Sequence, residues 1–565
     1  MHPVIILLIG VVIVIGGILV FRMHAFLALA LGALAVAALT PQANIERYWL
    51  DKNSVEVIAR PAADTFHLSA KTIGIRAGAV YYVELDNKGE TTEPSNTGEW
   101  AEVVVSSIKK VEAPGVSYAI AKLVDPSVAN IATDLVSDTK SIGFASKESK
   151  KTVGERVALA FGTTCGKVGI LIALAAIIGK CLLDSGAADR IVRAALGVTG
   201  ERGAPFAFMG SGFFLGVPVF FDTVFYLMIP LGKALRMRTG KNYLLYILTI
   251  VCGATMAHSL VPPTPGPLLV AEELGVDIGM MILFGGFVGL FSSAAGYLYA
   301  AYRNKYNEVP VRESADLSLE DLEALSKRDI SELPPLFLSL VPILLPVLFI
   351  AGHTVCKELH EIELISYTGM VKDLGATFGN KNIALMIAAI VSLGLLYRQK
   401  KTDLKELSAA AQSALSSGGV IILITAAGGA FGAMLQQTGV AGLLRELPTG
   451  PSPPTQLIII LAFLITTAIR TAQGSATVAM ITAVGVLAAF SDPQELGCHP
   501  IYLALAIGCG SKPIAWMNDS GFWVICKMSG MTEREGLRFV TPMSILMGVT
   551  GLLVTMILAA VYPMV

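Results

Sequence analysis

The sequence predicts an all-α polytopic membrane protein, built from inverted repeats with two opposed re-entrant hairpins and carrying a small extracytoplasmic β-containing insert. Of the 565 residues, 54% are apolar and only 15% are charged, against about 25% charged in an average soluble domain. The charges gather in residues 42–150, where 27 of 109 residues are charged. Apolar runs long enough to cross hydrocarbon occupy most of the rest.

The composition excludes several classes of protein. So apolar a chain is not a soluble enzyme, and a net charge of −1 offers no basic surface for nucleic acid. Seven cysteines show neither a disulfide framework nor CxxC metal spacing, and the HExxH, Walker and GxGxxG patterns are absent. We therefore expect no enzyme activity, no cofactor and no metal site, and we expect membrane lipid as the surroundings.

Loop charge predicts the topology. Two apolar runs, 4–21 and 25–39, flank Arg22, so they predict a helix pair whose loop lies in the cytoplasm. The chain then passes through an extracytoplasmic segment before it returns to the membrane. The predicted domains are an N-terminal transmembrane helix pair (1–40), the extracytoplasmic insert (41–150), a first repeat (151–335), linking transmembrane helices (336–408) and a second repeat (409–565).

Two further apolar runs predict hairpins rather than spans. Both ends of 204–232 adjoin loops rich in Lys and Arg, and its middle contains Gly216 and Pro218. Irregular backbone at membrane depth must be buried in protein or line a cavity. The 35-residue run 456–490 has no Lys or Arg in its far loop, so it predicts a hairpin that enters from the opposite face. The total is ten spanning helices and two hairpins.

A weak internal repeat relates the two halves. At an offset of 253 residues, the segment from Gly166 aligns with the segment from Gly419, and six of 28 positions match, among them Gly186 with Gly439. An odd number of predicted crossings separates the halves, which makes the repeats inverted. Chains of this kind bind solutes near the bilayer midplane, where corresponding helices are interrupted.

The insert contains alternating runs that predict short strands. They are VYYVELD and EWAEVVVSSIKKVEAPG. Three roles remain open for this module: a lid that captures a ligand, a contact between copies of the chain in a homo-oligomer, and an addition without function.

Ionisable side chains at membrane depth are costly, which makes them candidates for function. Asp222 lies in GVPVFFD, and either it carries a proton or it caps a helix at the break. His258 precedes LVPPTPGP, where four prolines forbid a regular helix and leave carbonyl groups and the Thr264 hydroxyl open to a ligand. A structural hydrogen-bond donor is the other interpretation of His258.

The segment RTAQGSATVAM places Arg470 at the break of the second hairpin. Its planar fork matches a carboxylate, and the small residues after it let backbone N–H groups approach an anion. Snorkelling of Arg470 to the interface and simple helix packing by the hydroxyl residues are the alternatives. The candidate residues that follow Arg470 in this segment are Gln473, Gly474, Ser475 and Thr477.

A fourth segment, NDSGFW, places three polar residues in a row at a glycine break. They are Asn518, Asp519 and Ser520, an arrangement that suits a hydroxyl-rich ligand. Lys512 lies just before them, and it is either a charge partner of Asp519 or, in the interpretation that we favour, a residue that snorkels to the interface.

In order and spacing, GVPVFFD, HSLVPPTPGP, RTAQGSATVAM and NDSGFW resemble the gluconate permease family of bacterial proton symporters, which belongs to the ion-transporter superfamily. The resemblance covers about 1–40 and 155–565, whereas the insert and Lys512-Pro513 depart from the family pattern. It implies an inner-membrane carrier of gluconate or a related small hydroxy acid. The site residues it implies are Asp222, His258, Thr264, Arg470, Gln473, Ser475, Thr477, Asn518, Asp519 and Ser520.

The resulting hypothesis is a secondary active transporter with a small organic acid and protons as its partners. Arg470 and the backbone amides after it hold the carboxylate, four polar side chains hold hydroxyls, and Asp222 or Asp519 carries the proton. The four are Gln473, Thr264, Asn518 and Ser520. The alternatives are a sodium-coupled carrier of dicarboxylates or other organic anions, and a membrane sensor in which the insert binds the signal.

Overall fold

The fold is known from a computed structural model, which describes most of the chain. The described residues are 2–21, 23–53, 57–62, 65–69, 80–85, 100–110, 117–123, 131–137, 139–312, 330–361, 364–401, 403–439, 455–488, 491, 493–517 and 519–564. The chain forms two compact units. The smaller comprises Met1–Ile9, Leu34–Arg156 and Met434–Glu446, and the larger comprises Gly10–Ala33, Val157–Ala433 and Leu447–Val565.

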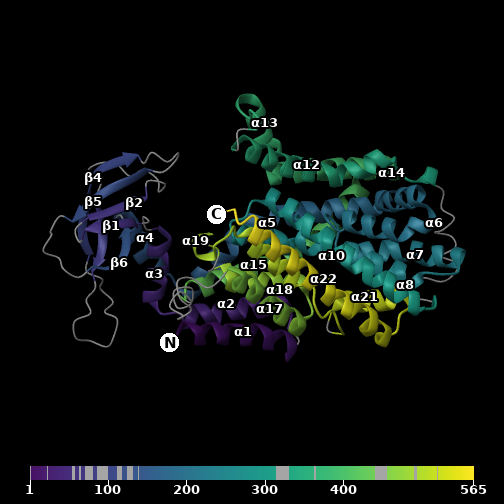
Figure 1. The fold of residues 1–565 in the computed structure, drawn as a ribbon, viewed down its shortest axis with the longest axis horizontal. Helices are drawn as coiled ribbons and strands as arrows, with labels where there is room; N and C mark the ends of the chain where they lie inside the picture. Colours follow the sequence, from purple (N-terminus) through teal and green to yellow (C-terminus); the bar gives the residue numbers. More distant parts are fainter. Residues whose placement is uncertain are drawn as a thin grey trace. The chain divides into compact units, whose positions relative to one another are not determined.

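In the described residues of the smaller unit, six strands form one antiparallel sheet in the order β1-β2-β5-β4-β3-β6 (Figure 1). The strands are β1 (Val57–Ala62), β2 (Thr65–Ser69), β3 (Val80–Leu85), β4 (Trp100–Lys110), β5 (Ser117–Leu123) and β6 (Ile131–Ser137). β3 and β4 coincide with the two alternating runs of the sequence. β4 pairs with β5 over most of its length, and a register shift falls between Val105 and Ser107.

Two helices flank the sheet in sequence and pack against each other. They are α3 (Gln42–Asn53) and α4 (Thr139–Ser149). Leu50 and Ala145 form a small buried cluster between them, with Trp49 and Ile142 against it. The Ser141 hydroxyl donates to the Asn53 carbonyl at 3.4 Å, so the two ends of the strand-bearing segment lie next to each other.

In the described part of the chain, eight helices are long and apolar enough to cross a membrane, or nine if the bent pair Ala25–Leu39 and Gln42–Leu50 is one span. The eight segments are Val153–Asp184, Tyr243–Glu273, Ile278–Tyr306, Leu336–His360, Lys381–Lys400, Leu404–Gln436, Thr455–Ala472 and Glu533–Val561. The sequence predicted ten. Three predicted spans are missing, because the two N-terminal helices, α1 (Pro3–Leu19) and α2 (Ala25–Leu39), are short and a third span is interrupted. One is gained, because Thr455–Ala472, the first arm of the predicted second hairpin, is long enough to cross a membrane.

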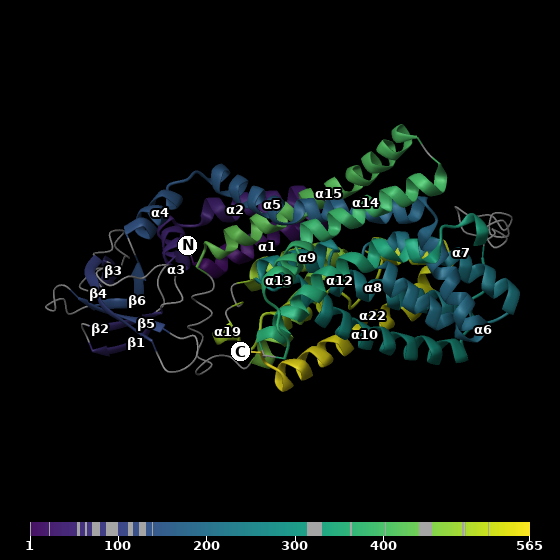
Figure 2. The ribbon, with the colours of Figure 1, turned by 90° about the horizontal axis from the view of Figure 1, so that it is seen from above.

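The long helices are α5 (Val153–Asp184), α6 (Ala187–Leu215), α8 (Tyr243–Leu260), α10 (Ile278–Tyr306), α12 (Leu336–Glu361), α14 (Lys381–Lys400), α15 (Leu404–Gln436), α17 (Thr455–Gln473) and α22 (Glu533–Val561). The shorter ones are α7 (Phe221–Thr239), α9 (Pro265–Glu273), α13 (Gly369–Phe378), α18 (Ala476–Leu487), α19 (Pro493–Leu496), α20 (Ile501–Gly510) and α21 (Ser520–Ser529). Figure 2 shows α14 and α15 joined by a short turn.

Four helix breaks divide these elements, and local chemistry explains each. Residues 216–220 separate α6 from α7, and 261–264 separate α8 from α9, because proline lacks the N–H that a helix requires. Between α17 and α18 the turn depends on Gly474, whose φ of 82° favours glycine. Residues 511–519 separate α20 from α21. The predicted span 501–517 is therefore wrong, because Pro513 ends α20 and disfavours helix just before it.

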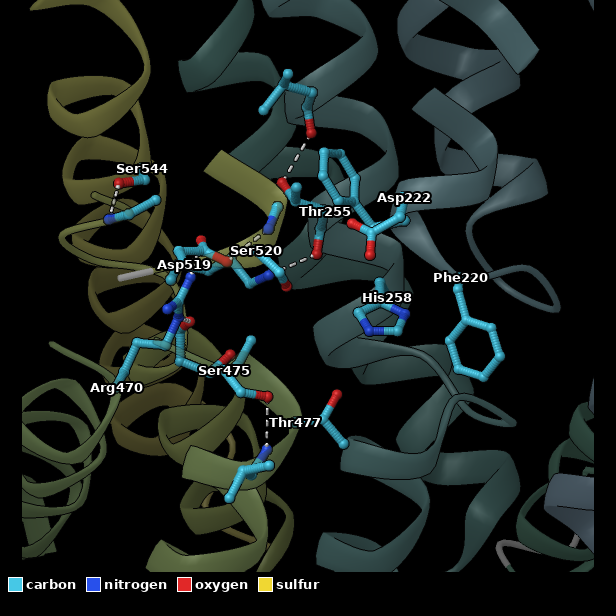
Figure 3. A pocket seen from close by; sticks show the side chains of 18 of the residues that line it. Phe220, Asp222, Thr255, His258, Arg470, Ser475, Thr477, Asp519, Ser520 and Ser544 are labelled. Atoms are coloured by element: carbon cyan, nitrogen blue, oxygen red, sulfur yellow. Dashed lines mark hydrogen bonds and ion pairs between the residues drawn. The ribbon is translucent and has the colours of Figure 1, made fainter. Parts of the chain in front are cut away.

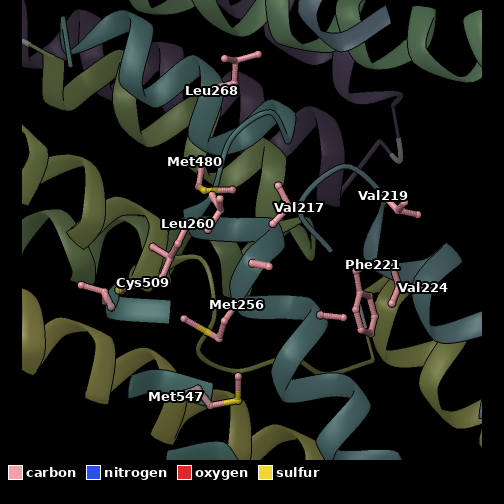
Figure 4. Packing of buried hydrophobic residues seen from close by; sticks show 14 of the residues in the cluster. Val217, Val219, Phe221, Val224, Met256, Leu260, Leu268, Met480, Cys509 and Met547 are labelled. Atoms are coloured by element: carbon pink, nitrogen blue, oxygen red, sulfur yellow. The ribbon is translucent and has the colours of Figure 1, made fainter. Parts of the chain in front are cut away.

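Buried apolar side chains hold the broken helices together (Figure 4). Met256 and Leu260 from α8, Met480 from α18, Cys509 from α20 and Met547 from α22 lie in one cluster and are almost fully buried. α8 also packs closely on α6, since a Cβ atom at Gly253 would lie 2.1 Å from the Met209 carbonyl oxygen. These contacts fix the four breaks around one point of the larger unit.

Helix starts recur at a constant spacing in the two halves. α7 begins at Phe221 and α18 at Ala476, α9 at Pro265 and α21 at Ser520, and α10 at Ile278 and α22 at Glu533. Each later start lies 255 residues after its counterpart. Gly186 and Gly439, which the sequence alignment paired, have φ values of 78° and 77°.

Candidate functional site

Residues in or directly beside all four helix breaks line one cavity of about 340 Å³ in the larger unit, which we call the helix-break cavity. Figure 3 shows Arg470 and Asp519 on one side of it and His258 and Phe220 on the other. A cavity of this size suits a small organic molecule. Its polar lining is Asp222, Thr255, His258, Thr425, Arg470, Ser475, Thr477, Ser511, Lys512, Asp519, Ser520 and Ser544.

Arg470 is held by two hydrogen bonds, and only 4% of it is exposed. Its Nη2 donates to Asp519 Oδ2, and its Nε donates to the Ser511 carbonyl at 3.1 Å. Nη1 is buried and has no hydrogen-bond partner. A buried donor without a partner is costly, so this nitrogen is suited to an acceptor that enters the cavity. The snorkelling interpretation of Arg470 is wrong.

Asp519 connects the guanidinium to the fourth break. It is the N-cap of α21, and its Oδ1 accepts from the Gly521 backbone N–H at 2.9 Å. Its Oδ2 is occupied by Arg470. Both carboxylate oxygens of Asp519 are thus engaged, which fixes the side chain as a support for Arg470.

Asp222 differs from Asp519 in this respect. It lies in the first turn of α7 and lines the cavity. Within the described residues, no hydrogen bond or ion pair engages its carboxylate. The helix-cap interpretation therefore has no support from a contact, and the carboxylate faces the cavity with its bonding capacity unused.

Lys512 is a buried cation, 8% exposed, at the start of the fourth break. Its Nζ donates to the Thr255 carbonyl at 2.9 Å, and no described carboxylate lies within ion-pair distance of it. The interpretation that Lys512 snorkels to the interface is wrong, because the break turns the side chain into the protein rather than along a helix. The cavity thus contains two buried cations.

His258 and the hydroxyl residues complete the lining. His258 Nδ1 is buried without a hydrogen-bond partner, and the imidazole lies against the Phe220 ring, with 6.0 Å between ring centroids. Ser475 is the N-cap of α18 and accepts from the Val478 N–H at 3.3 Å. Thr477 and Ser520 also line the cavity.

Not every predicted residue reaches the cavity. Thr264 is buried and donates to the Val261 carbonyl at 2.8 Å, and neither it nor Gly474 is part of the lining. The break brings the Thr264 backbone near the site, but the Thr264 hydroxyl is engaged in a hydrogen bond within its own turn. Asn518 and the Gln473 side chain lie outside the described residues.

Several lining residues escaped the sequence analysis, among them Thr425 and Ser511. Thr255 precedes His258 by three residues on α8, so helical spacing could have pointed to it. Ser544 belongs to α22, which shows no break; its Oγ accepts from the Ala515 N–H at 3.2 Å and thereby supports the fourth break. Phe220 was passed over as an apolar residue in GVPVFFD.

Known proteins are similar to this chain over most of its length. Residues 130–561 match the model of the GntP family permease, so the match includes all four breaks but not the first two helices. The gluconate permease of Pseudomonas aeruginosa is 32% identical over 412 residues, covering 71% of this chain and 86% of that protein. The low-affinity gluconate transporter of Escherichia coli is 31% identical over 399 residues, covering 70% and 86%.

Among solved structures, Neisseria gonorrhoeae MtrF, whose structure report describes a class of antimetabolite efflux pumps, is similar with a TM-score of 0.52 at 16% identity. The similarity covers 72% of this chain and 83% of that one, and it concerns the fold alone. The candidate spans and the permease relatives make this a multi-pass membrane protein and a transporter rather than an enzyme. The chain belongs to the GntP permease family.

Proposed function

We propose that this chain imports gluconate or a related small hydroxy or sugar acid by proton symport, with the helix-break cavity as its binding site. The observation that carries the proposal is the unpartnered, buried Arg470 Nη1 in a cavity that contains the unengaged carboxylate of Asp222. A carboxylate of the substrate supplies the missing acceptor. The names of the two gluconate-transporting relatives support the choice of substrate.

The charge of the cavity favours coupling to one proton per monovalent acid. With His258 neutral, the lining holds two cations, Arg470 and Lys512, and two carboxylates, Asp222 and Asp519. A bound sugar acid adds one negative charge, and a net charge at membrane depth is expensive. Protonation of Asp222 removes that charge, whereas the carboxylate of Asp519 is held by Arg470.

The hydroxyls of the substrate have nearby partners. Ser475, Thr477, Ser520 and His258 line the same cavity as Arg470. We assign these side chains to the hydroxyls, and Gln473 and Asn518 remain candidates from their positions in the sequence. Thr264 and Gly474 act through the backbone of their turns.

We also infer that the two halves are inverted repeats and that the hairpins α6–α7 and α17–α18 enter from opposite faces. The constant 255-residue spacing of three pairs of helix starts supports a duplication. Such an arrangement places interrupted segments of both halves at one midplane site. By the loop-charge rule, the insert 41–150 lies outside the cytoplasm, and the family resemblance favours the bacterial inner membrane.

The test is uptake of labelled gluconate into proteoliposomes, with unlabelled sugar acids as competitors. An inward proton gradient drives accumulation without sodium, and a protonophore abolishes it. Sodium dependence that survives the protonophore would assign the chain to sodium-coupled carriers instead. Absence of exchange with every sugar acid tested would refute the proposed substrate class.

A further inference from the structure

A second cavity of about 210 Å³ lies in the larger unit, and we call it the vestibule. Three elements line it: the C-terminal half of α5, the first helix break, and the N-terminal half of α15. The lining residues are Ala175, Ala176, Gly179, Lys180, Leu183, Pro218, Val219, Phe220, Thr223, Ser413, Ala414 and Ser417. Small side chains dominate it, so a polyhydroxy acid can lie between α5 and α15.

One residue, Phe220, lines both the vestibule and the helix-break cavity. α15 also passes from one to the other: Ser413 and Ser417 face the vestibule, and Ile421 and Thr425 face the helix-break cavity. These four residues are spaced by four, so they form one face of the helix. The two cavities are therefore neighbours along a single helix face, with Phe220 between them.

The position of Phe220 allows its side chain to move. It is the N-cap of α7, at the end of the irregular segment 216–220, and it is only partly buried. Its neighbour Phe221 is 8% exposed and packs against Phe225 at 5.9 Å between ring centroids. The Phe220 ring makes a T-shaped contact with the imidazole of His258 (Figure 3). Phe221 thus anchors the tip of the hairpin, while Phe220 faces space on both sides.

We propose that Phe220 is the gate between the helix-break cavity and the vestibule, and that the sugar acid leaves toward the cytoplasm through the vestibule. The direction follows from loop charge. The vestibule lies at the end of α5 that leads to Arg190 and Arg193, and at the end of α15 that follows Lys400 and Lys401. The sequence predicts that both of these basic segments lie on the cytoplasmic side. The identity of the solute in this inference rests on the proposed transport function. The two cavities and the position of Phe220 between them do not.

The test uses the full-length protein in membrane vesicles of either orientation. Ser417→Cys and Thr425→Cys are made separately, and a charged, impermeant thiosulfonate is applied from one side at a time. Modification of the engineered position is followed by peptide mass spectrometry, so the native cysteines can stay. We expect Ser417→Cys to react from the cytoplasmic side only, and Thr425→Cys to react slowly while Phe220 is present.

Phe220→Ala should accelerate modification of Thr425→Cys from the cytoplasmic side about tenfold or more, and leave the rate at Ser417→Cys unchanged. Phe214→Ala, which removes a ring of the same size from the same hairpin outside both cavities, is the control and should not accelerate it. If Phe220→Ala does not fold, Phe220→Leu should raise the rate of modification of Thr425→Cys, and Phe220→Trp should lower it. Equal rates with and without the Phe220 substitution would overturn the gate.

Gluconate separates this inference from the proposed function. Protection of Thr425→Cys by gluconate supports both. If gluconate neither protects nor is transported while Phe220→Ala still opens the path, the gate stands and the substrate assignment fails. If gluconate is transported but Phe220→Ala changes no rate, the transport function stands and the gate fails.

Discussion

At the residue scale, the proposed role of Arg470 in binding depends on the planar geometry of its guanidinium group as much as on its charge. Its Nε and Nη2 are used within the protein, and Nη1 remains for a ligand. Arg470→Lys keeps the charge but cannot serve these three acceptors at once. We expect this variant to fold and to bind gluconate at least tenfold more weakly, a loss of about 1.4 kcal/mol or more. Calorimetric titration of the purified protein measures it.

A matched pair of variants controls for folding. Arg470→Ala alone leaves the buried Asp519 carboxylate without its partner, which is strongly destabilising. Arg470→Ala with Asp519→Ala removes both charges, so its melting temperature should lie above that of the single variant while gluconate binding stays absent. Wild-type affinity in Arg470→Lys would contradict the assigned role.

Asp222 is expected to govern coupling rather than binding. In Asp222→Asn the cavity is neutral once the acid has bound, as in the wild type with a proton, so exchange of internal for external gluconate continues. Accumulation against a gradient is lost because the amide cannot take up and release the proton. Counterflow and proton-driven uptake in the same proteoliposomes separate the two activities. Wild-type accumulation by Asp222→Asn would place the proton elsewhere.

Lys512 should set the charge balance of the empty cavity. Lys512→Met leaves one cation against two carboxylates, so we expect gluconate affinity at neutral pH to fall about tenfold or more. Adding Asp222→Asn restores neutrality and should recover part of the affinity. A double-mutant cycle of binding free energies measures this coupling, and strictly additive effects of the two substitutions would rule out a shared charge balance.

The sequence predicted the acids and Arg470 of this site but misjudged Lys512, and the reason is physical. An ionisable residue within an apolar run is expensive to place in the membrane, so Asp222 and Arg470 could be recognised from the sequence as candidates for function. The direction of a lysine side chain, toward the membrane interface or into the protein, depends on the local backbone. The break at 511–519 directs the Lys512 side chain into the protein. Ser544 and Thr255 carry no such cost, because hydroxyls are ordinary in membrane helices.

At the element scale, the breaks decide where the site forms, and close helix packing keeps them there. Proline and glycine made three of the four breaks visible in the sequence, since they act locally, whereas the start of the fourth break at 511 was missed. The lengths of the helices beside the breaks were harder to predict. Hydropathy alone predicted that the helix from 501 continues to 517, whereas α20 ends after ten residues. Hydropathy reports burial in hydrocarbon or protein, and α20 is buried throughout by its neighbours.

The crossing of α6 and α8 offers a test of this scale. A Cβ atom at Gly253 would overlap the Met209 carbonyl oxygen, whereas one at Gly210 would meet nothing within 4 Å. Gly253→Ala must push the helices apart, which costs about 1–3 kcal/mol, and Gly210→Ala should leave stability unchanged or slightly raised. Thermal unfolding in detergent compares them. Equal melting temperatures would show that the crossing is not tightly packed.

At the scale of the whole molecule, the question is whether the sheet of the smaller unit takes part in transport. The residues of the helix-break cavity and of the vestibule all belong to the larger unit. The match to the permease family begins at residue 130, after five of the six strands. The machinery of transport is therefore expected to work without the strands.

The contact between Ser141 and Asn53 makes the corresponding deletion feasible, because the ends of the strand-bearing segment are already adjacent. Replacing residues 54–138 with a short Gly/Ser linker keeps α3, α4 and their buried cluster intact. We expect gluconate uptake in proteoliposomes to remain within about twofold of wild type. Substituting Trp49 by Ala in the full chain disturbs the helix pair alone and serves as the control. If the shortened protein is folded and binds gluconate but no longer transports it, the sheet acts in the transport cycle. The sheet would then be a sensor or a lid rather than a dispensable module.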